Sequence, residues 1–201
     1  MNAPMASAPA EGALARIGPN SVLQLVPLLD EALGREERDR LLHLSGLDEL
    51  PGDDGLMDEA PAACLHQAVR AHHPALAPAL TRCAGERTAD YIIRHRIPVA
   101  ALRVLRALPP WLSAPLLASV IEKHAWTFAG SGTFRVRSRH PLVFELIDNP
   151  VVRGEHAEGP ICAWHAAVFQ RLFNHIVDAN LRCVETQCCA AGASSCRFEL
   201  R

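Results

Sequence analysis

The sequence predicts an α+β protein whose helices pack on an antiparallel sheet. Apolar residues recur at helical spacing through most of residues 21–130, whereas apolar and polar residues alternate over residues 133–150. A final helical stretch is followed by two short segments with strand character. This order, in which helices come first and the chain ends in a β-α-β-β arrangement, is typical of an α+β fold with an antiparallel sheet.

The length and composition indicate one globular domain. The chain has 201 residues, of which 49% are hydrophobic and 21% are charged. Residues 1–16 are rich in Ala, Pro and Gly and are expected to be a mobile tail. Residues 17–201 are expected to form the single domain, which is helical over 17–130 and consists of strands, a helix and a hairpin over 131–201.

The first helix is expected over residues 21–34, where the apolar residues form a stripe. Asn20 or Ser21 can cap its start, and Gly34 supplies its end. A second, more charged helix follows directly. The acidic residues 48–59 are then expected to form a solvated loop.

Two longer helical regions follow. Residues 60–95 predict two helices separated by the sequence HHPALAP, and Cys83 is expected to be a small buried residue in the second of them. The most apolar region spans residues 98–130; it is interrupted by two consecutive prolines and ends at Gly130.

The C-terminal third combines strands with one helix. The alternation over residues 133–150 predicts two strands, or one bent strand, turning near Pro141. An amphipathic helix is predicted over residues 160–177, and strands are predicted over residues 181–191 and 195–200.

Charge and hydropathy argue against two classes of partner. A net charge of −2, with Lys and Arg scattered along the chain, provides no basic stripe for nucleic-acid phosphates. No apolar run reaches the roughly 18 residues of a membrane span, and the first residues lack the pattern of a secretory signal. We therefore expect a cytoplasmic protein whose seven cysteines are mostly thiols, used in metal binding, catalysis or simple burial.

A thiol-rich segment near the end of the chain predicts a metal site. Glu185, Cys188 and Cys196 follow the pattern E-x2-C-x7-C across two predicted strands and a glycine turn. Two thiolates and a carboxylate can bind Zn²⁺, which usually takes four ligands in a structural site. Cys162 is the first candidate for the fourth ligand, with Cys183 and Cys189 as alternates. The other interpretation is that these cysteines are small buried side chains or an oxidation-prone surface cluster.

The segments GERTADYIIRH, HPLVFELIDNPVVRG, ICAWHAAVFQRLF and VETQCCAAGASSCRFEL resemble the vinyl-4-reductase domain family. The resemblance covers roughly residues 17–201 and is densest from Ala84 onward. It implies a fold shared with vesicle-tethering TRAPP subunits, often dimeric through helices. Related sensor domains of phenol-responsive activators hold zinc with a Cys at a helix start and with Glu, Cys and Cys in a terminal hairpin. Carried over position by position, these ligands are Cys162, Glu185, Cys188 and Cys196, and the zinc would be structural.

The resemblance also implies a role in bacteriochlorophyll synthesis. The family's name asserts a reaction, the reduction of the 8-vinyl (formerly 4-vinyl) group of divinyl chlorophyllide or protochlorophyllide, which needs a donor such as NADPH. The sequence shows no G-x-G-x-x-G after a strand, no Gly-rich phosphate loop and no further cysteine set for an iron-sulfur cluster. We therefore expect a carrier that binds a Mg-porphyrin or divinyl chlorophyllide. The alternatives are the reductase itself and a sensory or scaffolding domain.

The residues expected to bind the tetrapyrrole are apolar aromatics and one histidine that can ligate magnesium. They are Trp111, His124, Trp126, Phe128 and Phe144, and His140, His165 and His175 are the other candidates for the magnesium ligand. The alternatives are that the aromatics are plain core and that the histidine is a surface residue.

Charged partners and catalytic groups complete the sequence-based expectations. Five arginines can pair with propionate carboxylates, or they can form a solvated strand or helix face: Arg87, Arg94, Arg135, Arg137 and Arg139. No Ser-His-Asp grouping is readable, and no catalytic residue is assigned. The partners implied are the tetrapyrrole, the porphyrin-binding subunit of magnesium chelatase or the Mg-protoporphyrin methyltransferase, and a second copy in a homodimer.

Overall fold

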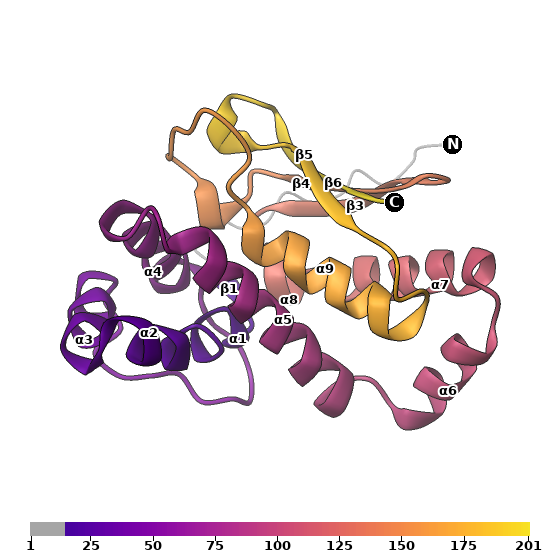
Figure 1. Cartoon of the computed structure of the whole chain (residues 1–201), viewed down its shortest axis with the longest axis horizontal. Helices are drawn as coiled ribbons and strands as arrows, with labels where there is room; N and C mark the ends of the chain where they lie inside the picture. The colour runs from indigo at the N-terminus through magenta and orange to yellow at the C-terminus, as the bar shows by residue number, and fades with distance from the viewer. Residues whose placement is uncertain (1–14) are drawn as a thin grey trace, which may run out of the picture.

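The computed structural model describes residues 15–201 and confirms the α+β fold class. Four strands form an antiparallel sheet in the order β3-β4-β6-β5, and Figure 1 shows helices gathered on one side of it. A two-stranded sheet pairs β1 with β2. The strands are β1 (Arg16–Ile17), β2 (Met57–Asp58), β3 (Thr133–Arg139), β4 (Leu142–Ile147), β5 (Cys183–Gln187) and β6 (Ser195–Leu200).

Helices occupy most of the chain before β3, and one further helix separates β4 from β5. Within residues 15–201 no helix is both long enough and apolar enough to cross a membrane. The helices are α1 (Asn20–Leu23), α2 (Val26–Leu33), α3 (Arg35–Leu44), α4 (Glu59–His72), α5 (Ala77–His95), α6 (Val99–Ala107), α7 (Pro110–Lys123), α8 (Trp126–Ala129) and α9 (Ala163–Ile176), with short 3₁₀ turns η1 (Pro150–Val152) and η2 (Cys189–Ala191).

The first predicted helix is divided into α1 and α2. Pro27 lies in the first turn of α2, where a missing N–H leaves no hydrogen bond unmade. The predicted caps Asn20 and Ser21 are wrong, because Pro19 occupies the N-cap position and no side chain caps α1. Gly34 ends α2 as predicted, with φ of 84°.

Helix α5 buries one stripe of residues against the rest of the protein. Leu80, Ala84 and Thr88 belong to this stripe, and Cys83 lies outside it and is exposed. The predicted burial of Cys83 is therefore wrong. Helical periodicity alone identifies the stripe, but it does not place a small residue at its margin.

The acidic segment 48–59 is only partly a solvated loop. Asp58 pairs with Arg16 in the two-stranded sheet and also caps α4. The prediction is wrong for Glu59, which is 7% exposed. Its carboxylate accepts hydrogen bonds from the backbone and hydroxyl of Ser131 at 2.7 and 2.6 Å and pairs with Arg153 at 3.3 Å. Of the predicted N-terminal tail, residues 1–14 lie outside the described residues.

The four-stranded sheet has one apolar face and one charged face. Side chains alternate across a strand, so Phe144 and Phe198 point toward the helices while Glu145 and Arg197 point away. The predicted turn near Pro141 lies between β3 and β4. The sheet can therefore anchor the core on one side and present charge on the other.

Helix α9 is the centre of the core. It lies beside α5 and covers the apolar face of the sheet (Figure 1). Phe169 packs edge to face on Phe144 and Phe198, with ring centroids 4.9 and 5.3 Å apart. Burial of a side chain of this size stabilises the fold by about 1.5–3 kcal/mol.

Helices α5 and α9 approach each other closely at Gly85. A Cβ atom at this position would lie 2.8 Å from the Cβ of Ala167 and even closer to the carbonyl oxygen of Trp164. The backbone of α9 cannot move away without disturbing its contact with the sheet. The crossing of these two helices therefore depends on the missing side chain of Gly85.

Replacing Gly85 by Ala is expected to lower the free energy of unfolding by about 1–3 kcal/mol, because overpacking outweighs the roughly 1 kcal/mol gain in helix propensity. Urea unfolding followed by circular dichroism measures this change. Gly159→Ala, in the loop before α9, is the control for adding a methyl group without a clash, since an added Cβ there meets nothing within 4 Å. A Gly85→Ala protein as stable as the control would contradict the close approach.

Candidate metal centre

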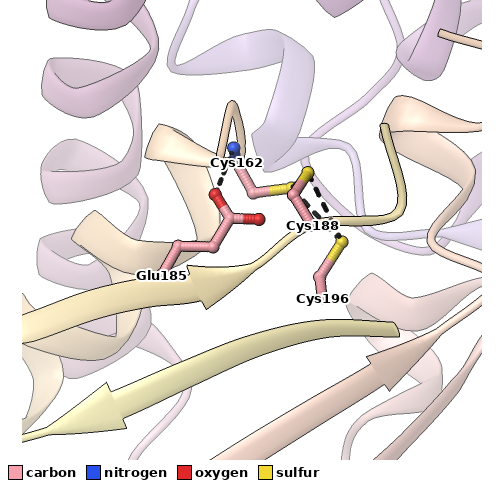
Figure 2. A group of neighbouring side chains, drawn as sticks. All are labelled: Cys162, Glu185, Cys188 and Cys196. Carbon is pink, nitrogen blue, oxygen red and sulfur yellow. Dashed lines mark hydrogen bonds between the residues drawn. The ribbon is translucent and has the colours of Figure 1, made fainter. Parts of the chain in front are cut away.

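Four side chains from separate parts of the chain meet in one cluster, shown in Figure 2. Cys162 immediately precedes α9, Glu185 lies in β5, Cys188 follows β5, and Cys196 lies in β6. Their ligand atoms all lie within 4.8 Å of one another. We call these four residues the Cys/Glu cluster; they are the four that the sequence resemblance named.

The sulfur atoms of the cluster are spaced as ligands of a single metal ion. Cys162 Sγ lies 3.8 Å from Cys188 Sγ and 3.6 Å from Cys196 Sγ, and the remaining pair is 3.9 Å apart. Tetrahedral zinc with Zn–S bonds near 2.3 Å requires sulfur separations of about 3.8 Å. All three cysteines are free thiols. The triangle of sulfur atoms therefore matches one face of a tetrahedral zinc site.

Glu185 supplies the fourth corner. Its Oε2 accepts a hydrogen bond from the backbone N–H of Cys162 at 2.7 Å, which orients the carboxylate toward the sulfur atoms (Figure 2). Its Oε1 is buried and has no hydrogen-bond partner. A buried carboxylate oxygen without a partner is costly, and coordination of a cation would satisfy it.

The electrostatics of the cluster also favour a cation. Burial raises the pKa of Glu185 to about 8. Hydrogen bonds with Cys188 and Cys196, together with burial, raise the pKa of Cys162 well above its ordinary value. Without a positive charge these groups cannot all ionise together. A divalent ion would lower these pKa values, because it stabilises the thiolates and the carboxylate alike.

A second layer of hydrogen bonds supports the sulfur atoms. Asn149 is buried, and its Nδ2 lies 3.4 Å from Cys162 Sγ and 3.6 Å from Cys196 Sγ. The backbone N–H of Cys189 donates to Cys196 Sγ at 3.4 Å. Donors aimed at sulfur favour the thiolate and orient the ligand. Sequence reasoning missed Asn149, although the pair Asn149-Pro150 marks a turn at the end of the segment predicted as strand.

The two alternate ligands lie outside the cluster. Cys183 is buried at the start of β5, and burial raises the pKa of its thiol to about 12. Cys189 is half-buried and begins η2. With three sulfurs and one carboxylate, the Cys/Glu cluster can complete a four-coordinate site from protein ligands alone. Such a closed site is typical of structural zinc and leaves no position at which water could be activated.

The residues expected to bind the tetrapyrrole fall into two groups. Phe128 and Phe144 belong to the aromatic core around Phe134, with ring centroids 5.1 and 5.3 Å from its ring. Trp111 and Trp126 are 66% and 57% exposed. The structure therefore places Phe144 inside the protein, Phe128 half-buried against the core, and the two tryptophans on the surface.

The solvent side of α7 carries an exposed apolar surface. Leu112, Leu116 and Val120 are spaced by four residues, so they share one side of the helix, and all three are exposed. We call them the α7 face. Trp111 and Trp126 are exposed near its two ends in the sequence.

His124 follows the α7 face by four further residues and is exposed. Its Nδ1 lies 2.9 Å from the carbonyl oxygen of Val120. A carbonyl only accepts, so Nδ1 carries the proton and Nε2 keeps its lone pair in the neutral ring. From β3, Arg139 reaches the same helix and donates to the carbonyl of Pro115 at 2.9 Å and to Ser119 Oγ at 3.0 Å.

Two other histidines are fully buried in the core. His66 donates from Nε2 to the carbonyl of Ser21 at 3.1 Å, whereas both ring nitrogens of His165 lack a protein partner. The ring of His165 lies among those of Phe128, Phe169 and Phe198. Burial lowers the pKa of both histidines to about 3. Both are therefore neutral in the folded protein near neutral pH.

Comparison with known proteins confirms the resemblance seen in the sequence. A model of the vinyl-4-reductase domain matches residues 142–201, a stretch that contains the whole Cys/Glu cluster. The bacteriochlorophyll synthase 23 kDa chain of Cereibacter sphaeroides is 51% identical over 185 residues, covering 92% of this chain and 90% of that protein. The protein of the same name from Rhodobacter capsulatus is 46% identical and is covered over 86% of its length.

Solved structures with a similar fold include H-NOX proteins. The Fe(II) unliganded H-NOX protein from K. algicida matches with a TM-score of 0.62 and 14% identity, over 92% of this chain and 96% of that one. An H-NOX protein from S. oneidensis in the Fe(II)NO ligation state matches with a TM-score of 0.58 and 11% identity, over 92% and 98%. At these identities the likeness shows the fold alone.

The purified protein is expected to contain about one zinc ion per chain. Cys188→Ser should lose the metal and unfold at a lower temperature, because metal bound only by the folded state stabilises it. Metal analysis and thermal unfolding measure the two effects. Cys64→Ser is the control, since Cys64 is exposed and outside the cluster. A wild-type protein that is purified without metal and is nevertheless fully stable would contradict the prediction.

The two buried histidines predict a loss of stability in acid. Their pKa values are lower in the folded than in the unfolded chain, so the unfolded state binds more protons as pH falls from about 6.5 toward 3. Each histidine should then lower the free energy of unfolding by about 1.4 kcal/mol per pH unit. Urea unfolding between pH 6 and pH 4 should give a shallower pH slope for His165→Phe than for the wild type. Equal slopes would contradict the burial of a neutral His165.

Proposed function

The chain belongs to the family of the bacteriochlorophyll synthase 23 kDa chains and carries a vinyl-4-reductase domain, and we propose that it serves bacteriochlorophyll synthesis by binding a tetrapyrrole intermediate. The ligand class is a Mg-porphyrin or divinyl chlorophyllide. The protein acts as an accessory or carrier that holds the pigment between enzymatic steps.

The observation that carries this proposal is the exposed α7 face with His124 at its end. Contiguous exposed apolar surface commonly marks a binding site. A flat apolar macrocycle would cover Leu116 and Val120 and remove them from water. Nε2 of His124 offers the single neutral nitrogen donor that a Mg-tetrapyrrole takes as an axial ligand.

The surroundings of the α7 face suit the remaining parts of such a ligand. Trp111 and Trp126 provide exposed aromatic surface near its two ends. Arg139 uses one guanidinium nitrogen on α7 and retains further donors for a propionate carboxylate. Phe128 and Phe144 pack on Phe134 and do not touch the pigment in this proposal.

Zinc in the Cys/Glu cluster has a structural role in this proposal. Cys162, Glu185, Cys188 and Cys196 would hold the ion, which joins the start of α9 to the β5–β6 hairpin. The spacing of the sulfur atoms and the unpartnered Oε1 of Glu185 support zinc as the occupant. No catalytic residue is assigned.

The proposed partners are the enzymes that supply or consume the pigment. The porphyrin-binding subunit of magnesium chelatase and the Mg-protoporphyrin methyltransferase are the two candidates, in addition to a second copy of the chain. A carrier must release its ligand to such an enzyme, and a ligand held on an exposed helix face is accessible for transfer.

Adding Mg-protoporphyrin to the purified protein is expected to shift the pigment's absorption saturably, at about one pigment per chain. His124→Ala should weaken binding about tenfold or more, equivalent to about 1.4 kcal/mol, because the axial ligand is lost. His72→Ala is the control, since His72 is exposed on α4. Unchanged affinity in His124→Ala would contradict the site.

A second arm of the same experiment separates the carrier from the alternatives. Divinyl protochlorophyllide is incubated with the protein and NADPH, and the pigments are separated by chromatography. Binding without a new pigment supports the carrier. Appearance of the 8-ethyl product would establish the reductase, and absence of any pigment binding would favour a sensory or scaffolding domain.

A further inference from the structure

The face of the sheet that points away from α9 gathers three arginines around one carboxylate. The register places Arg135 on β3 opposite Glu145 on β4, and Glu145 opposite Arg197 on β6. Arg137, two residues further along β3, also reaches Glu145. We call Arg135, Arg137 and Arg197 the arginine face. None of these residues belongs to the Cys/Glu cluster or to the α7 face.

Glu145 is held firmly at the centre of this group. It is 4% exposed and accepts hydrogen bonds from Ser195 Oγ at 2.9 Å and from Arg197 Nε at 3.1 Å. Arg135 and Arg137 pair with it at 3.2 and 3.4 Å. Burial opposes ionisation, but the hydrogen bonds from Ser195 and Arg197 and the nearby arginines lower the pKa of Glu145 overall.

One ionised carboxylate leaves this group with an excess of positive charge. Three guanidinium groups and one carboxylate carry a formal charge of +2. The contacts with Glu145 use only one nitrogen of each arginine, and a guanidinium has five N–H donors. Donors therefore remain for a second, external anion.

A surface hollow of about 400 Å³ lies beside two of these arginines. Arg137 and Arg197 line it, together with Ser138, Thr186 and Gln187, whose side chains can donate hydrogen bonds. Glu199 also lines the hollow, and its carboxylate is paired with Arg201 at 2.5 Å. Arg135 takes part in the same charge cluster but does not line the hollow.

We propose that this hollow binds a small dianion that presents either one phosphate or two carboxylates. Guanidinium groups match the geometry of both oxyanions in a fork of two hydrogen bonds. Two negative charges would balance the formal excess on the arginine face. The volume is that of a small-molecule site. This proposal stands independently of tetrapyrrole binding, since Arg139, not Arg137, reaches α7.

The test is a titration of the full-length protein with inorganic phosphate and, separately, with succinate, followed by ¹H–¹⁵N NMR at constant ionic strength. Saturable shifts are expected for residues lining the hollow, and the tighter of the two probes identifies the class of anion. Constant ionic strength is needed because salt screens exposed charges.

Arg137→Gln is expected to weaken binding of that probe at least tenfold. Arg135→Gln is the matched control. Arg135 also lies on β3 and pairs with Glu145, so this variant removes the same charge, but Arg135 does not line the hollow. Its loss should weaken binding less than threefold. Equal losses in both variants would show general attraction to a basic surface and overturn the site. The site would also be overturned if neither phosphate nor succinate saturated the protein by about 10 mM.

Discussion

Helix α9 packs on the apolar face of the sheet through a group of phenylalanines, and the placement of every candidate site depends on this contact. Phe169 meets Phe144 and Phe198, which lie on two neighbouring strands. The contact sets the direction of α9 and thereby the position of Cys162 at its start. Because α5 crosses α9 at Gly85, the same contact also aligns the helical half of the protein with the sheet.

The Cys/Glu cluster lies where this arrangement needs reinforcement. The segment between η1 and α9 is irregular, and the β5–β6 hairpin lies at one edge of the sheet. Cys162 belongs to the first of these and the other three residues to the second. A metal bound by all four would add to the hydrogen bonds that already join these two segments, from the N–H of Ala157 to the carbonyl of Ala190 at 2.9 Å and from the N–H of Cys162 to Glu185 at 2.7 Å. Asn149 adds a neutral link from the end of β4, because its side chain reaches two of the sulfur atoms.

The two exposed surfaces differ in chemistry because they arise from different elements. The α7 face is apolar, since α7 lies at the periphery and presents a leucine or valine to solvent on three successive turns. The arginine face is charged, since Arg135 on β3 and Arg197 on β6 alternate with core residues and lie on either side of Glu145. Arg137 occupies the irregularity between Val136 and Ser138 and reaches the same carboxylate. Arg139 lies between them in the chain and contacts α7. The proposed amphipathic ligand and the proposed anion would therefore bind on separate surfaces of the protein.

Local patterns in the sequence determined much of this architecture. The helical and alternating periods located most helices and strands, since amphipathic spacing depends only on which side of an element is buried. The four residues of the cluster were named through a family resemblance; their spacing alone left Cys183 and Cys189 open. Only the tertiary structure showed that Oε1 of Glu185 lacks a partner, that Glu59 is buried, and that Trp111 and Phe144 lie in different environments. These facts depend on contacts between residues distant in the chain, and no local pattern encodes which distant side chains will meet.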